Sequence, residues 1–272
     1  MASGKSRGFG LFFAIVTVAI GVAVAWGFSR GWLPEVASEH GKGVDGVIHY
    51  LMWSTGVLFL VGHLALGYFI FKYSKDQAQA NAAVSHRTEA KAAIAPVLAM
   101  MAVSEIGVLV VGLPVFDEIY GEAPADAITI EVVGKQFEWL VRYAGPDGVF
   151  GKVDPKLVHD SRNPLGLDKK DPAAKDDIVK RGVVTIPVDK TCVVNLRSHD
   201  VIHSFTVPFF RTKQDTLPGF TARTKFVPTK EGQFELACAE LCGLGHYRMQ
   251  GKVVVMNNED YEKWLSEQES WL

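Results

Sequence analysis

The sequence predicts a membrane-anchored all-β protein, in which N-terminal transmembrane helices precede a β-sandwich. Three long apolar segments lie within the first 120 residues, and short β-rich runs broken by turn residues follow Gly121. A stretch of about 20 apolar residues is long enough to cross the hydrocarbon core of a bilayer. Many short strands separated by turns are typical of a sandwich or barrel and not of an α/β fold.

The overall composition argues against nucleic acid as a partner. Of the 272 residues, 48% are hydrophobic, and the formal net charge is −2. A nucleic-acid-binding protein needs a basic face, which this near-neutral balance does not provide. The uneven placement of the apolar residues predicts three parts: an N-terminal transmembrane helix with a linker (1–45), a transmembrane helical hairpin (46–120) and an extramembrane domain (121–272).

The first apolar segment, residues 8–28, follows the basic residues Lys5 and Arg7. A basic start and an apolar run are also the pattern of a signal peptide. The run is longer than a usual signal core and no clean Ala-x-Ala cleavage site follows it. We therefore expect a retained transmembrane helix.

Segments 48–73 and 92–116 are the second and third predicted spans. The loop between them carries an excess of positive charge, from Lys72, Lys75, Arg87 and Lys91. Loops rich in lysine and arginine stay in the cytoplasm. Three crossings then place the N-terminus inside and everything after residue 116 outside.

Two ionisable residues, His63 and Glu105, lie within these spans at broadly similar depth. Because such groups are costly in hydrocarbon, we expect them to pair with each other or with a neighbouring subunit. A packing hydrogen bond is favoured over a proton-conducting role.

The extramembrane part contains eight predicted strands: 128–133, 137–143, 183–188, 192–197, 202–207, 223–227, 233–237 and 252–256. Cys192 alternates with apolar residues and is expected to be a core residue of its strand. The polar stretch 144–181 is predicted to be a functional or partner-binding loop. Residues 259–272 are expected to form an amphipathic helix, with Tyr261, Trp264, Leu265 and Leu272 on one face.

The chemistry is concentrated between Cys238 and Met249, where two thiols, the imidazole of His246 and a thioether lie within a dozen residues. Soft sulfur ligands select copper, zinc or iron–sulfur clusters, and a thioether is a familiar weak ligand of copper. The second thiol, Cys242, allows two thiolates to bridge two copper ions. His203 is a candidate for one more imidazole ligand.

A disulfide and a zinc site are the alternatives for this segment. Structural zinc sites usually have four cysteine or histidine ligands in paired spacing, whereas this segment supplies three and a methionine. No Cys-x-x-Cys-His is present, which excludes covalent haem attachment to this chain.

The stretch Cys-Ala-Glu-Leu-Cys-Gly-x-Gly-His-x-x-Met strongly resembles the metal signature of subunit II of cytochrome c oxidases. The resemblance covers about residue 46 to the C-terminus and includes the Val-Ile-His-Ser-Phe stretch around His203. It implies a cupredoxin-like β-sandwich outside the membrane. It also implies a dinuclear copper centre (CuA) with six ligand residues: Cys238 and Cys242 as bridges, His203 and Met249 on one copper, and His246 and the Glu240 backbone carbonyl on the other.

The resemblance implies further sites on the side of subunit I. In the family, the side chain at the position of Glu240 also reaches a magnesium ion shared with subunit I. Glu89 lies seven residues before Pro96, like the family's glutamate at the mouth of a proton pathway. A surface charge whose stem lies along apolar neighbours is the alternative for Glu89.

One motif departs from the family. Where the family has Gly-His-Gln-Trp-x-Trp, this chain has Phe137 in place of the tryptophan proposed to receive electrons. Phe137 and Trp139 are two residues apart, so a strand would place both on one side as an aromatic face. They are the candidates for the place where electrons arrive.

The function implied by the resemblance is electron transfer within a respiratory oxidase. A c-type cytochrome, or a donor complex that carries one, would reduce CuA, and haem in subunit I would receive the electron for reduction of O2 to water. Asp200 and Asp215 are expected to steer a basic cytochrome. The alternative is a membrane-anchored copper-delivery or assembly protein. The expected location is the bacterial inner membrane with the copper domain on the periplasmic side, in preference to the mitochondrial inner membrane.

Overall fold

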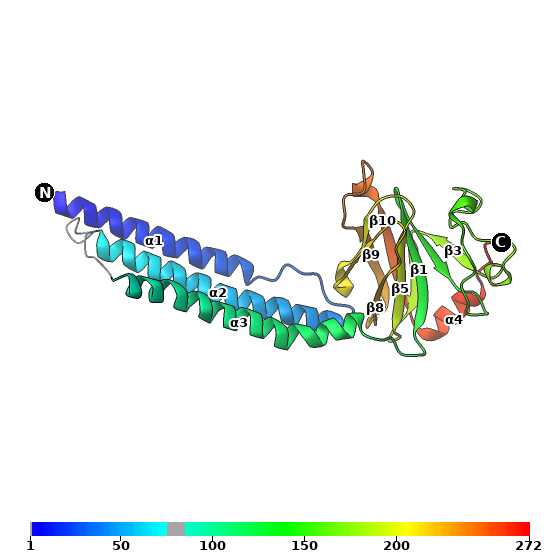
Figure 1. Ribbon diagram of the computed structural model, residues 1–272, viewed down its shortest axis with the longest axis horizontal. Helices are drawn as coiled ribbons and strands as arrows, with labels where there is room; N and C mark the ends of the chain where they lie inside the picture. The colour runs from blue at the N-terminus through cyan, green and yellow to red at the C-terminus, as the bar shows by residue number, and fades with distance from the viewer. Residues whose placement is uncertain (1, 75–84) are drawn as a thin grey trace. The chain divides into compact units, whose positions relative to one another are not determined.

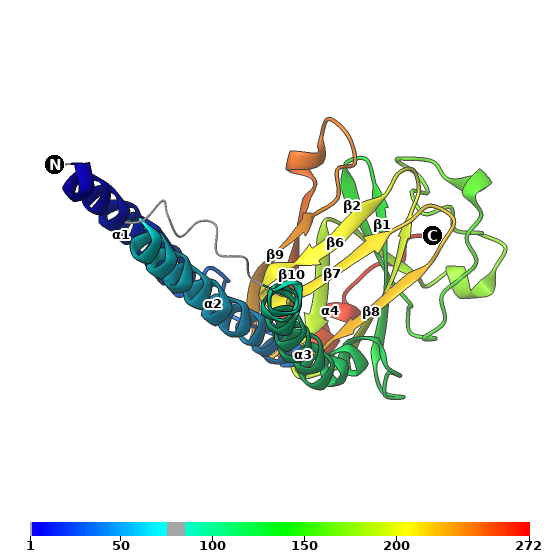
Figure 2. The same ribbon diagram turned by 60° about the vertical axis from the view of Figure 1, so that its left-hand side comes forward.

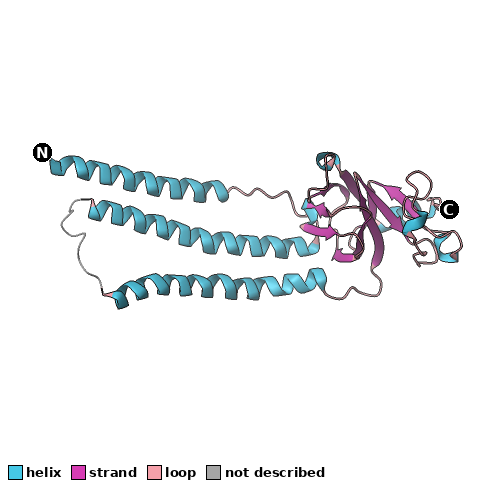
Figure 3. Cartoon of the chain, turned by 45° about the horizontal axis from the view of Figure 1, so that its top comes forward, coloured by secondary structure: helices cyan, strands magenta, loops and turns pink. Residues whose placement is uncertain are grey.

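The computed structural model describes residues 2–74 and 85–272, and side chains from Gly8 onward within them. Three long helices come first in the chain and the strands follow (Figures 1 and 3). Contacts divide the chain into a mainly helical unit and a second unit, composed of Pro34–Val44 and Val115–Leu272, which contains the strands.

The three helices are α1 (Ala2–Phe28), α2 (Glu39–Tyr73) and α3 (His86–Tyr120). Each contains a stretch long and apolar enough to cross a membrane, which confirms the three predicted spans. Among the basic residues used to predict the orientation, Lys75 lies outside the described residues, as do the side chains of Lys5 and Arg7.

Small residues bring the helices close together. A Cβ atom added at Gly21 of α1 would lie 2.9 Å from Cγ of His63 on α2. The Tyr50 hydroxyl of α2 donates to the Val103 carbonyl of α3, and Gly107 leaves the space for the Tyr50 ring. Close backbone approach at small residues is the usual way in which transmembrane helices pack.

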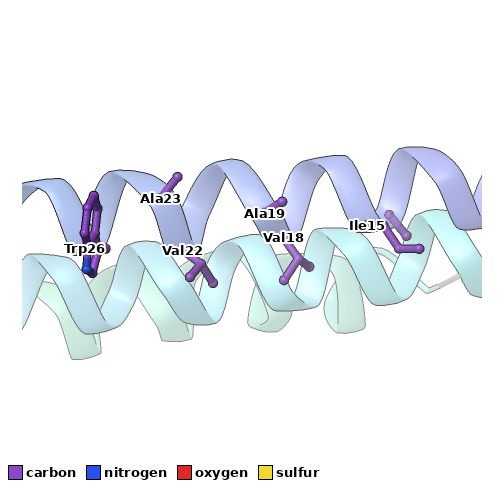
Figure 4. Close-up of a pocket in the computed structure, with 7 residues that line it drawn as sticks. Ile15, Val18, Ala19, Val22, Ala23 and Trp26 are labelled. Carbon is purple, nitrogen blue, oxygen red and sulfur yellow. The ribbon is translucent and has the colours of Figure 1, made fainter.

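A shallow apolar groove of about 670 Å³ runs along α1 (Figure 4). Its lining includes Ile15, Val18, Val22 and Trp26, with alanines between them. The groove therefore offers hydrocarbon surface only.

His63 and Glu105 do not pair with each other. The His63 ring lies against Gly21, and its Nδ1 is 2.9 Å from the Phe59 carbonyl oxygen. Within the described residues, no hydrogen bond or ion pair reaches the Glu105 carboxyl. Of the two expected partners, the described residues do not show the pairing of His63 with Glu105, and a neighbouring subunit stays a prediction.

The strands form two five-stranded sheets. The first has the order β3-β2-β1-β5-β8, and its strands are Ile178–Arg181, Glu138–Tyr143, Ile128–Lys135, Cys192–Ser198 and Ala222–Phe226. The second has the order β4-β10-β9-β6-β7, and its strands are Val183–Pro187, Gln250–Met256, Gly232–Cys238, His203–Val207 and Thr212–Thr216. Two strand pairs, β1 with β5 and β4 with β10, are parallel. Figure 2 shows β6, β7 and β9 as one layer of this sandwich.

The main core lies between the sheets and takes residues from both, among them Trp139, Leu196, Phe205 and Val253. Cys192 is fully buried in this core, as predicted, and burial raises the pKa of its thiol to about 12. The domain is the expected cupredoxin-like β-sandwich.

Two strands were missing from the prediction, β3 and β7. Both lie at the edge of a sheet. β7 is Thr-Lys-Gln-Asp-Thr, and β3 has four residues, two of them basic. Edge strands are often short and charged, which leaves little apolar alternation to recognise.

The stretch 144–181 is not the single long loop that was expected. It contains two short 3-10 helices, Pro155–Leu157 and Pro172–Ala174, and ends in β3. Leu165, Leu167 and Ala174 pack with Val133 and Leu140 as a second core. Because side chains alternate along a strand, β1 and β2 contribute residues to both cores.

The C-terminal helix is shorter than expected. α4 spans Asn258–Ser266. The residue before it, Asn257, caps the helix, because its side chain accepts a hydrogen bond from the Asp260 backbone N–H. Trp264 and Leu265 pack against the main core. Leu272 lies beyond the helix and packs against the second core, so its predicted place on the helical face is wrong.

Candidate metal centre

Strand pairing brings His203 to the cysteine loop. Cys238 is the last residue of β9 and pairs with Phe205 on the neighbouring strand β6. His203 begins β6, two residues before Phe205, so its side chain lies on the same face of the sheet as that of Phe205. The Ala239 backbone N–H donates to the Ser204 carbonyl and holds the start of the loop against β6.

Sulfur and nitrogen atoms converge at this end of the sandwich. Cys238 Sγ lies 3.9 Å from Cys242 Sγ and 4.0 Å from His203 Nδ1. Cys242 Sγ lies 3.7 Å from both His246 Nδ1 and Met249 Sδ. The structure therefore brings together two thiols, two imidazoles and a thioether, all of which were singled out in the sequence.

The Glu240 carbonyl oxygen completes this donor set, because it lies 3.2 Å from Cys238 Sγ. The Glu240 side chain is exposed and has no partner in the described part of the chain. His203, Cys238, Cys242 and Met249 are buried, and His246 is half-buried. Most of the donors are therefore shielded from solvent, and His246 is the side chain nearest the surface.

The donor atoms suit a soft metal ion. Both cysteines are free thiols, and ligand atoms of His203, Cys238 and Cys242 lie within 4.8 Å of one another. Burial, together with the nearby Cys238 sulfur, raises the pKa of the Cys242 thiol to about 11. A metal cation would compensate two adjacent thiolates in this setting, and soft thiolate and thioether donors favour copper.

Outside the donors, two polar residues hold the imidazole and the loop. His203 Nε2 lies 2.8 Å from Asp200 Oδ1, which leaves Nδ1 facing the sulfurs. The Gln136 side chain donates to the Cys242 carbonyl, and the Gln136 backbone N–H donates to Asp200 Oδ2. From the sequence, Asp200 was expected only to steer a partner and Gln136 had no expected role, because their contacts depend on three loops that meet at one end of the fold.

Phe137 and Trp139 do not form one exposed face. Phe137 lies in the turn between β1 and β2, ahead of the strand that was predicted to contain it, and Trp139 is fully buried. The Trp139 and His203 ring centroids are 6.0 Å apart. Phe137 covers the cysteine loop, where a Cβ added at Gly243 would lie 3.1 Å from its Cζ. Only Phe137 is therefore accessible to a partner.

Glu89 lies apart from these donors along the sequence, in the first turn of α3, and its side chain is exposed. In the described residues it has no hydrogen bond or ion pair. Its position at the start of a helix agrees both with a place at the mouth of a proton pathway and with a surface charge.

The fold and the site together define a membrane-anchored cupredoxin-like protein with a group of sulfur and imidazole donors that could hold a metal ion. A sequence model described as the periplasmic domain of cytochrome c oxidase subunit II matches residues 128–257. A protein named alternative cytochrome c oxidase subunit 2, from Bradyrhizobium diazoefficiens, is 34% identical over 258 residues, which are 94% of this chain and 91% of that protein. The chain belongs to the cytochrome c oxidase subunit II family.

Two further proteins are similar to this chain. Cytochrome c oxidase subunit 2 of Cereibacter sphaeroides is 28% identical over 256 residues, which are 89% of this chain and 79% of that protein. A crystal structure of the periplasmic domain of subunit II of the Bradyrhizobium japonicum cytochrome oxidase is 29% identical. The matched region is 53% of this chain and 95% of the chain in the crystal, and the TM-score is 0.38.

Proposed function

We propose that this chain is the subunit through which electrons enter a respiratory cytochrome c oxidase, by way of a dinuclear copper centre. The observation that carries the proposal is the convergence of Cys238, Cys242, His203, His246 and Met249 at one end of the sandwich. A copper pair held there would supply one-electron redox chemistry without an open position for a substrate.

Each ligand has a defined role in this proposal. Cys238 and Cys242 would each be shared by the two ions, which their 3.9 Å sulfur–sulfur separation supports. His203 and Met249 would hold one ion, and His246 and the Glu240 carbonyl would hold the other. Burial of four of the side chains and the hydrogen bonds to the loop would hold the donors in place, so little rearrangement would accompany a change in charge.

We infer that electrons arrive from a c-type cytochrome, or from a donor complex that carries one, over the Phe137 ring. Phe137 is half-buried and lies over the cysteine loop, and the Arg248 guanidinium is 5.9 Å from its ring centroid. Trp139 lies beneath, against His203, and serves as packing between the turn and the metal ligand. Asp215, whose carboxylate makes no hydrogen bond or ion pair within the described residues, remains a candidate for steering the donor.

The remaining roles concern the partner subunits. We propose that haem in subunit I receives the electron and that O2 is reduced there, that other oxidase subunits complete the complex, and that the exposed Glu240 carboxylate binds magnesium at the subunit I interface. Glu89 is proposed to lie at the mouth of a proton pathway. We place the protein in the bacterial inner membrane with the copper domain in the periplasm, which the three apolar helices and the match to a periplasmic domain support.

The experiment that tests the copper centre is low-temperature electron paramagnetic resonance of the full-length chain, purified in detergent and loaded with copper. A seven-line hyperfine pattern is expected, because one electron is shared by two copper nuclei. The Met249→Leu variant should alter this pattern, whereas Met256→Leu, outside the site, should not. A four-line pattern from a single copper, or no bound copper, would contradict the proposal and favour a copper-delivery protein.

A further inference from the structure

Leu244 is an exposed apolar side chain beside the Phe137 ring. It is 98% exposed, more than any other large apolar side chain in the described part of the chain. The glycines on either side of it, Gly243 and Gly245, lie against the Phe137 ring, because a Cβ atom added at either would meet that ring. Leu244 and Phe137 therefore form one apolar surface next to the metal donors. Adjoining apolar side chains in such a position often mark a contact with another protein.

The carboxylates that adjoin the β1–β2 turn all have partners. These are the carboxylates of Glu138, Asp160 and Asp200. Their partners are Arg181 at 2.7 Å, Lys135 at 2.5 Å and the His203 ring at 2.8 Å. A carboxylate whose charge is offset by a neighbouring cation or by hydrogen bonds attracts a basic protein less than a free one.

The cation beside Phe137 is not offset in this way. The Arg248 side chain is exposed, and its guanidinium lies 5.9 Å from the Phe137 ring centroid. Within the described residues, the guanidinium makes no hydrogen bond or ion pair. Contact with an aromatic face leaves its N–H groups available, and they are well suited to a carboxylate. The apolar surface thus has a free positive charge at its edge.

Two carboxylates without a bond in the described residues, Asp215 and Glu240, do not pair with Arg248. Asp215 precedes Thr216, whose hydroxyl oxygen would lie 3.1 Å from a Cβ atom added at Gly134, between the sheets. Because side chains alternate along a strand, Asp215 points to the outer face of the second sheet. The Glu240 carboxylate is proposed above to lie at the subunit I interface.

We propose that the electron donor is an acidic c-type cytochrome, which presents an apolar haem edge to Phe137 and Leu244 and a carboxylate to Arg248. The proposal rests on the proposed function, because it concerns the donor to the same copper centre. The donor haem iron gives up one electron, which the copper centre accepts. Aromatic residues and arginine often contribute most to binding at an interface, and complementary charge governs the rate of association and the choice of partner.

Stopped-flow reduction of the purified oxidase by two reduced soluble c-type cytochromes, one acidic and one basic at pH 7, tests the choice of donor. At low ionic strength the acidic cytochrome should react faster, and its rate should decrease as salt is added. An equal or higher rate with the basic cytochrome would overturn the proposal and favour steering by Asp215.

Substitutions test the two parts of the surface separately. Arg248→Gln should slow the acidic cytochrome by about 2- to 5-fold at low salt, the range for one exposed ion pair, and Arg248→Glu should slow it more. Lys213→Gln removes an exposed cation from the outer face of the second sheet and is the matched control. Leu244→Ala should slow the reaction at low and high salt alike, because salt does not screen an apolar contact. Unchanged rates in Arg248→Glu or in Leu244→Ala would contradict the surface.

Two controls separate this proposal from the copper centre itself. The copper resonance spectrum, and reduction by ascorbate through a small uncharged mediator, should be the same in Leu244→Ala as in the unsubstituted protein, because Leu244 supplies no ligand. Absence of the two-copper spectrum from the unsubstituted protein would contradict the proposed function. A normal spectrum without preference for the acidic cytochrome would contradict only the choice of donor.

Discussion

At the scale of single residues, Asp200 links the metal ligands to the neighbouring loops. Burial by itself raises the pKa of its carboxyl, but the hydrogen bonds from the Gln136 and Val201 backbone N–H groups and from His203 outweigh burial and lower the pKa below its usual value. Asp200 is therefore a carboxylate that orients His203. A second partner that holds the far nitrogen of a metal-binding histidine is a common feature of metal sites.

Asp200→Asn should weaken copper retention by about 10- to 100-fold, the usual effect of losing such a partner. Asp215→Asn removes a nearby carboxylate that bonds to nothing in the described residues, so it is the matched control and should retain copper normally. Competition of the full-length protein against a copper chelator measures both. Equal retention by the two variants would show that Asp200 does not support His203.

Arg142 is buried in β2 and bonds to two carboxylates. Its guanidinium lies 3.1 Å from Glu131 Oε2 on β1 and 2.7 Å from Asp177 Oδ2. It also donates to the Gly151 carbonyl, so one side chain joins the first sheet to the stretch 144–181. Burial raises the pKa of Asp177, and Arg142 opposes that shift.

Arg142→Met should destabilise the folded domain by about 3–5 kcal/mol, because two buried carboxylates lose their partner. Folded Asp177 holds its proton more tightly than the unfolded chain, so stability decreases as the pH rises above about 3.9. The variant lacks the opposing charge, so the loss should be larger at pH 7 than at pH 4. Denaturant unfolding at both pH values measures this.

Arg197→Met is the control for Arg142. Arg197 is partly exposed and makes one ion pair, with Glu131. Its loss should cost less than about 1 kcal/mol. If both variants lost the same stability, the buried network would not be the cause.

At the scale of elements, the turn between β1 and β2 contacts the cysteine loop directly. Lys135 pairs with Glu138, so Gln136 and Phe137 alone make the connection. Gln136 donates a hydrogen bond to the cysteine loop, and the Phe137 ring covers that loop. Gly245 allows this contact, because an added Cβ there would collide with the Phe137 ring.

Phe137→Ala should slow electron uptake from a reduced c-type cytochrome by about tenfold or more, as expected for loss of an aromatic residue central to an interface. The copper resonance spectrum should not change, because Phe137 donates no ligand. Stopped-flow reduction of the purified oxidase measures the rate. Tyr247→Ala removes another exposed aromatic residue, and an equal effect there would contradict a specific role for Phe137.

At the scale of the whole molecule, the helical unit and the strand-containing unit have opposite surface chemistry. Large apolar side chains are exposed along all three helices, whereas the second unit buries most of its large apolar residues in two cores and exposes several, among them Leu241 and Leu244. Exposed apolar surface of this extent is typical of membrane contact. The basic residues Lys72, Arg87 and Lys91 then favour a cytoplasmic connection between α2 and α3.

This topology predicts that protease added to spheroplasts digests the domain 121–272. An epitope tag between Lys72 and Arg87 should be protected until the membrane is permeabilised. Inverted membrane vesicles should give the opposite result, which serves as the control. Digestion of the tag in intact spheroplasts would show that the chain crosses the membrane in the other direction.

Much of this protein follows from local patterns in its sequence. Apolar length alone marks the three spans, alternation marks the interior strands, and the spacing from Cys238 to Met249 marks the metal donors. Each of these patterns lies within the same short segment whose structure it predicts, so the sequence alone is enough to recognise it.

Only the tertiary structure showed that His203, already a candidate in the sequence, and Asp200 lie beside the two cysteines, and only sheet pairing explains the polar edge strand β7. Three further features appear only in the folded chain. Trp139 is buried, and part of the stretch 144–181 packs in a second core. Glu105 has no partner in the described residues. Each of these depends on contacts between segments far apart in the chain. Local periodicity carries no information about such contacts, because they are selected by burial and pairing in the folded state.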